Sequence, residues 1–138
     1  MRPGQFGPWQ VSLASLAVSC AAGLANIEFL EENKLADQAL KKGEFLRAQL
    51  ERLKAKYPLI GEVRGKGLMM GMELVRDKEK TPANTEGGRI RDFCCEKGVL
   101  IGLGGIYGNV ARIQPPLVIS QAELEEVVKV LDQAFPKI

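Results

Sequence analysis

An apolar stripe with helical spacing lies between residues 35 and 57. Its members recur in steps of three and four residues, which places them on one face of an α-helix. They are Leu35, Ala39, Gly43, Leu46, Leu50, Leu53 and Tyr57. Because Pro58 cannot continue a helix, the pattern predicts a helix over residues 35–56. Other apolar elements must cover this stripe, and a chain of 138 residues is long enough for one domain with a core that does so.

Three further helices and three or four strands are expected around this helix. The helices are predicted over residues 10–32, over residues 85–97, and from Ser120 onward, where Ser120 and Glu123 form a capping box. The strands are predicted over residues 61–64, 68–75, 99–102 and 110–114, the last ended by Pro115 and Pro116. Met69, Met70 and Met72 are interpreted as core filling. This order predicts an α+β fold whose sheet is covered by helices mainly on one face.

The residue types that are absent exclude several chemistries. The sequence contains no histidine, which removes histidine-based catalytic triads, HExxH zinc sites and imidazole acid–base catalysis. Its three cysteines, Cys20, Cys94 and Cys95, form neither a CxxC pair nor an even framework. We interpret them as small core residues in a protein of a reducing compartment, the cytoplasm, or the mitochondrion in a eukaryote. No metal site is expected.

Neither a membrane nor a nucleic acid is expected as a partner. The apolar run over residues 11–25 superficially resembles a secretory signal, but serines interrupt it and it is too short to span a bilayer. A buried helix rich in small residues is the preferred interpretation. The basic residues between Lys41 and Lys66 are interleaved with glutamates, which is typical of a solvated helix face.

Two glycine-rich stretches call for a test of nucleotide binding. The stretch GLGGIYGN, residues 102–109, has tyrosine where a GxGxxG motif needs its last glycine, and no helix follows it. The stretch RGKGLMMG, residues 64–71, fails on the same grounds. Both are interpreted as turns that need unusual backbone angles. Just beyond the first stretch, Arg112 lies in a predicted strand, where the residues alone favour a surface or ion-pair role.

Three segments and the closing helix resemble the tail of class III pyridoxal-phosphate aminotransferases, and most of all the alanine–glyoxylate type. The segments are AVSCAAGLANIEFLEENKL (residues 17–35), GEVRGKGLMMGMELVRD (residues 61–77) and EKGVLIGLGGIYGNVARIQPPLVIS (residues 96–120). The resemblance implies the C-terminal small domain of a fold type I enzyme, with a small, mostly antiparallel sheet covered by helices. It also implies a homodimer with its active sites at the subunit interface, and amino acid and keto acid substrates. The family's arginine before PPL binds the substrate carboxylate, which assigns substrate binding to Arg112.

The resemblance does not cover the whole enzyme. In the family, the lysine that binds pyridoxal phosphate and the aspartate that pairs with its pyridine nitrogen lie upstream of this region. We therefore expect no catalytic or cofactor-binding residue and no covalently bound cofactor in this chain, and no activity of the chain alone. Residues 1–16 are expected to be an irregular segment foreign to the family, with the small domain over residues 17–138. The alternative is a catalytically dead, stand-alone small domain that acts as a binding or interaction module.

Overall fold

The computed structural model describes residues 8–138, and the side chains of residues 16–138. The chain divides into two units, residues 1–35 and residues 36–138. The first unit contains helix α1 (Pro8–Glu32). The elements that follow are α2 (Leu35–Lys56), β1 (Ile60–Lys66), β2 (Met69–Leu74), α3 (Asn84–Glu96), β3 (Gly102–Gly104), β4 (Val110–Ile113), α4 (Gln121–Ala134) and a short 3₁₀ helix (Phe135–Lys137). No helix within the described residues is long and apolar enough to cross a membrane.

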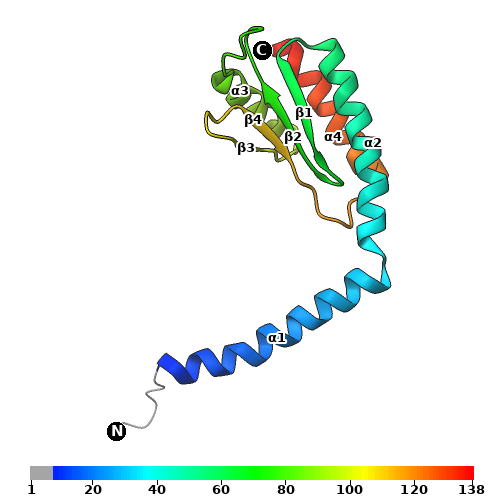
Figure 1. The fold of residues 1–138 in the computed structure, drawn as a ribbon, viewed down its shortest axis with the longest axis vertical. Coiled ribbons are helices and arrows are strands. Elements are labelled where there is room, and N and C mark those ends of the chain that lie inside the picture. Colours follow the sequence, from blue (N-terminus) through cyan, green and yellow to red (C-terminus); the bar gives the residue numbers. More distant parts are fainter. Residues whose placement is uncertain (1–7) are drawn as a thin grey trace. The chain divides into compact units, whose positions relative to one another are not determined.

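The second unit is built around one antiparallel sheet. Its strand order is β1-β2-β4-β3, so β4 returns between the hairpin β1–β2 and the short strand β3 (Figure 1). All three strand pairs are antiparallel. Gly71 of β2 and Gly102 of β3 are the register partners of Arg112 on its two sides. This architecture confirms the predicted α+β fold with an antiparallel sheet.

The two faces of the sheet differ sharply. Alternate residues of a strand face opposite sides, and one set on each long strand is buried. The buried set belongs to a single core with residues of α2, α3 and α4, and it comprises Val63, Met70, Met72, Leu74, Ala111 and Ile113. The other face carries Arg64, Gly71 and Arg112, and Arg64 and Arg112 are exposed there. We call this second surface the open face. The prediction that helices cover the sheet mainly on one face is confirmed.

The predicted stripe forms the contact of α2 with the core. Leu46, Leu50 and Leu53 are buried there. Gly43 faces the backbone of Gly67 so closely that a Cβ at residue 43 would overlap it. At the end of the stripe, the Tyr57 ring stacks on Phe135 with 4.7 Å between the ring centroids. The capping box of α4 is also confirmed, because Ser120 Oγ accepts a hydrogen bond from the Glu123 N–H and Glu123 accepts one from the Ser120 N–H.

Two predicted elements need correction. Strand β3 lies over Gly102–Gly104 and not over residues 99–102. The reason is a Schellman-type helix end: Gly98 adopts φ +80°, and the N–H groups of Gly98 and Val99 donate to the carbonyls of Cys95 and Cys94. The N–H of Val99 is therefore bound to the helix end and not to a strand. At the other end of the chain, α1 begins at Pro8, a position that proline favours, which confirms the helix predicted over residues 10–32. Residues 8–16, which were also assigned to an irregular segment, are therefore helical. Residues 1–7 lie outside the described residues.

Three side chains expected in the core are exposed. Met69 is 62% exposed, because strand alternation turns it away from Met70 and Met72. Cys94 is buried as expected, but Cys20 and Cys95 are exposed. Cys95 follows Cys94 on α3, and neighbouring helix positions lie on different faces of the helix. The interpretation of all three cysteines as core residues is therefore wrong for two of them.

Candidate functional site

Arg112 projects from the open face of the sheet, in the middle of β4. Its neighbours in register on both sides are glycines, so neither adjacent strand presents a side chain beside it. Across the sheet the row reads Arg64 of β1, Gly71 of β2, Arg112 of β4 and Gly102 of β3. The long cationic side chain of Arg112 therefore has no side chain beside it at the paired position of either neighbouring strand.

The side chain of Arg112 lies over β3 and not over β2. A Cβ placed on Gly104 would be 3.1 Å from the Nε and 3.2 Å from the Cδ of Arg112. A Cβ on Gly102 would be 3.3 Å from its Nη2 and 3.4 Å from its Nε. A Cβ on Gly71 would instead meet Val110 Cγ1 at 3.2 Å. The guanidinium thus occupies the space where side chains at residues 102 and 104 would begin.

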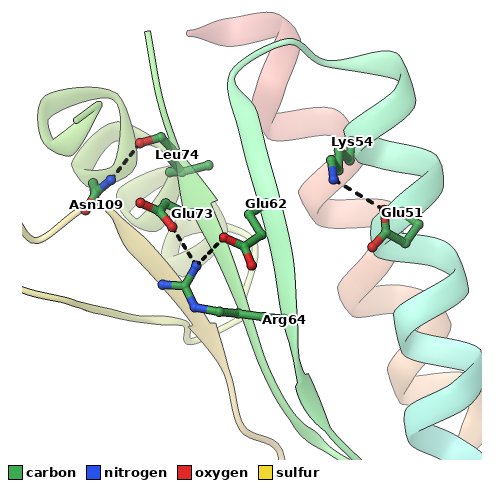
Figure 2. A network of polar contacts seen from close by, with 7 residues as sticks. All are labelled: Glu51, Lys54, Glu62, Arg64, Glu73, Leu74 and Asn109. Atoms are coloured by element: carbon green, nitrogen blue, oxygen red, sulfur yellow. Dashed lines mark hydrogen bonds and ion pairs between the residues drawn. The ribbon is translucent and has the colours of Figure 1, made fainter. Parts of the chain in front are cut away.

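The side chain of Arg112 has no hydrogen-bond or ion-pair partner among the residues that the structure describes. Arg64, on the same face, is engaged: its Nη1 lies 2.6 Å from Glu73 Oε2 and 3.3 Å from Glu62 Oε2 (Figure 2). Arg76 likewise donates to both carboxylate oxygens of Glu86. A guanidinium presents five N–H donors in a planar fork that matches a carboxylate. The donors of the Arg112 side chain can therefore bind an external anion, whereas Nη1 of Arg64 already pairs with two carboxylates, whose charges offset that of the guanidinium.

A buried amide anchors the start of β4. Asn109 is 3% exposed, and its Nδ2 donates to the carbonyl of Leu74 at 2.9 Å, as Figure 2 shows. The N–H of Leu74 in turn donates to the carbonyl of Asn109 at 2.8 Å. These two bonds attach the residue before β4 to the end of β2. They fix the strand from which Arg112 projects.

The glycine-rich stretches serve two different purposes. The positive φ angles of Gly67, Gly105 and Gly108 confirm a turn within each stretch, whereas Gly65, which also has a positive φ angle, lies in β1. Gly102 and Gly104 lie in a strand and have no such angle, and sequence reasoning missed their contact with Arg112. The signal for them in the sequence is their spacing of two, which places both glycines on one face of a strand.

Two lysines line hollows of the described structure, and neither has the surroundings that the implied cofactor needs. A lysine forms a Schiff base through its unprotonated amine, which a lowered pKa or an adjacent base favours. Lys56 lines a hollow of about 500 Å³, but its hydrogen bond to Asp132 raises its pKa and favours the charged form. Lys66 lines another hollow, of about 320 Å³, whose lining residues include no carboxylate to pair with a pyridine nitrogen. Nor do residues 16–138 contain a cluster of acidic or cysteine side chains suited to a metal ion.

Comparisons of the sequence and of the structure with known proteins identify the same family. The family model described as Aminotransferase class-III matches residues 14–135. A curated relative, alanine–glyoxylate aminotransferase 2 homolog 2, mitochondrial, of Arabidopsis thaliana, is 45% identical over 123 residues, which are 88% of this chain and 26% of the relative. The chain thus spans about a quarter of the length of the curated relatives that it matches.

Solved structures give the same result. An aminotransferase of Bacillus anthracis superposes with a TM-score of 0.81 at 38% identity, over 86% of this chain and 28% of that one. An amine transaminase from an uncultivated Pseudomonas species, in its PLP-bound internal aldimine form, superposes with a TM-score of 0.77 at 37% identity, over 86% of this chain and 27% of that one.

Proposed function

This chain belongs to the class III aminotransferase family, and from that premise we propose that it is the C-terminal small domain of an enzyme that transfers an amino group between an amino acid and a keto acid. The family match over residues 14–135 and the relatedness to an alanine–glyoxylate aminotransferase support this proposal. The small share of each relative that the chain covers favours a domain of a larger enzyme over a stand-alone binding module.

Arg112 binds the carboxylate of the substrate in this proposal. The supporting observation is its guanidinium, which lies exposed on the open face without a partner among the described residues. Two parallel charge-assisted hydrogen bonds from the fork to a carboxylate fix both the position and the orientation of the amino acid. Arg64 is less suited to this role, because Glu62 and Glu73 at its Nη1 offset its charge and repel a further anion.

The remainder of the enzyme supplies the cofactor site. Pyridoxal phosphate is the cofactor of class III aminotransferases, and it acts as the electron sink when bound. Because the described residues offer neither a suitable lysine nor a paired carboxylate, the cofactor is held by the large domain. The contribution of this chain is to bind and orient the substrate carboxylate.

Helix α1 contacts the large domain or a second subunit of a homodimer. Most residues of the helix are apolar, its charged residues are Glu28, Glu31 and Glu32 near its end, and every described side chain on it is exposed. Leu16, Val18, Leu24 and Ile27 are each more than half exposed. We infer that another part of the intact enzyme covers this helix, because an exposed apolar surface of this kind is unfavourable in water. As in the relative whose name places it in mitochondria, the enzyme works in a reducing compartment, either the cytoplasm or the mitochondrion.

The proposal is tested by separating the two domains. When the 138-residue chain alone is mixed with pyridoxal phosphate and then reduced with borohydride, no cofactor should be trapped on one unique lysine. In a separate assay with pyridoxal phosphate and without borohydride, the chain alone should show no transamination. The same chain joined to the large domain of a class III relative should transaminate. Trapping on one lysine together with turnover by the chain alone, or an inactive chimera that folds and binds the cofactor, would contradict the proposal.

A further inference from the structure

We propose that Gly102 and Gly104 are positioning residues that hold the guanidinium of Arg112 in the orientation that binds a carboxylate. The inference rests on the proposed function of Arg112 and adds the part of the fold that directs it. We call the backbone surface at these two glycines the glycine floor.

The backbone itself does not require glycine at either position. Neither residue has a φ angle in the left-handed region, unlike Gly105 at +82° and Gly108 at +66°. An L-residue could therefore adopt both conformations without strain. Glycine in a strand also loses more conformational entropy on folding than alanine, which makes it an unfavourable choice without another reason. Proximity to Arg112 supplies that reason.

The floor determines where the guanidinium can lie. No hydrogen bond to a described residue holds the guanidinium of Arg112, so contact with neighbouring atoms must define its orientation. A Cβ on Gly102 or Gly104 would come within 3.1–3.3 Å of its Nε or Nη2. Contacts this close force the neighbour to move by a few tenths of an ångström. The exposed end of Arg112 is the part that can give way, so an added methyl group would lift and tilt the fork while the strand remains in place.

The same contacts argue against a merely structural role. Gly71 is the register partner of Arg112 on the opposite strand, yet the atoms that its Cβ would meet are Val110 Cγ1 and the carbonyl oxygen of Arg64. Gly71→Ala therefore adds the same methyl group to the same face without touching Arg112. The pair Gly104→Ala and Gly71→Ala separates an effect on the arginine from a general effect on the sheet.

The experiment uses the full 138-residue chain and NMR of the arginine side chains. The Nε–Hε signal of Arg112 is identified by its loss in Arg112→Lys. In the parent chain we expect nuclear Overhauser contacts from this side chain to the Hα protons of Gly102 and Gly104. Acetate, a monocarboxylate probe, should shift the Arg112 signal, and the initial slope of the titration measures affinity. Arg64, already paired with Glu62 and Glu73, should shift less.

The variants decide the inference. Gly102→Ala and Gly104→Ala should each reduce the titration slope about three- to tenfold, as expected when one of two charge-assisted hydrogen bonds is weakened. Gly71→Ala should keep the parent slope. If the parent responds to acetate and all three variants respond equally, the floor has no positioning role, and the function of Arg112 stands. If the Arg112 signal of the parent does not respond, the proposed carboxylate site fails and the inference fails with it. Two independent glycine variants keep the test decisive if one of them unfolds.

Discussion

Replacement of Asn109 by alanine should destabilise the sheet that carries Arg112. Asn109 is the one polar side chain buried among the described residues, and its amide donates to Leu74 O at 2.9 Å. Leu74 O also accepts from the N–H of Ala83 at 3.1 Å, so the variant leaves this carbonyl satisfied. The loss is thus one hydrogen bond, about 1 kcal/mol, and a small void, for a total of about 1–2 kcal/mol.

Asn109→Asp should cost more and should depend on pH. The carboxylate cannot donate to Leu74 O, and an unpaired buried charge is strongly unfavourable, so we expect a loss of about 3 kcal/mol or more at neutral pH. Burial raises the pKa of such a carboxyl group above its unfolded value. Because the protonated form can donate again, the lost stability should return as the pH falls toward about 4.

Urea unfolding followed by circular dichroism measures these changes. Gln133→Ala is the matched control, since Gln133 is an exposed amide on α4 and its removal should change the free energy of unfolding by less than about 0.5 kcal/mol. A loss in Asn109→Ala no larger than in this control would refute the anchoring role of the buried amide. An Asn109→Asp variant with stability independent of pH would refute its burial.

Three further predictions concern the rest of the chain. Hydrogen bonds from Lys56 and Tyr57 lower the pKa of Asp132, so Asp132→Asn should reduce the free energy of unfolding at pH 7. The difference from the parent should vanish as the pH falls well below about 4, and a difference independent of pH would contradict this prediction. Burial raises the pKa of the Cys94 thiol to about 11, so at pH 8 a thiol reagent should label the exposed Cys95 and leave Cys94 unlabelled until unfolding, as peptide mass spectrometry can check. The apolar surface of α1 should make the chain self-associate, most simply as a dimer, and light scattering that gives a monomer at high concentration would count against it.

The local elements could be predicted because short-range signals determine them. The stripe of Leu46, Leu50 and Leu53 and the capping box of Ser120 depend on residues a turn or two apart. The sheet faces also follow from alternation, and Arg112 is exposed as a surface or substrate-binding role requires. The division into a segment over residues 1–16 and a domain over residues 17–138 stays a prediction.

Other features depend on contacts between segments distant in sequence. The start of β3 was predicted wrongly because the N–H of Val99 donates to the end of the preceding helix, and sequence propensity does not predict this hydrogen bond. The contact of Gly104 with Arg112 depends on the register of β3 against β4, which no local pattern specifies. Strand alternation alone predicts that Met69 is exposed, but the three methionines were assigned to the core together because of their apolar composition.

The most direct test of the account measures Arg112→Lys in this chain joined to the large domain of a class III relative. The variant keeps the charge and loses the fork, so kcat/KM for α-amino acids should fall about ten- to a hundredfold. Turnover of amines without a carboxylate, and thermal stability, should barely change. Arg64→Lys is the control on the same face and should leave the ratio of the two rates as in the parent. If Arg112→Lys reduces both substrate classes equally, or lowers only the melting temperature, Arg112 is a structural residue and the proposed site is wrong.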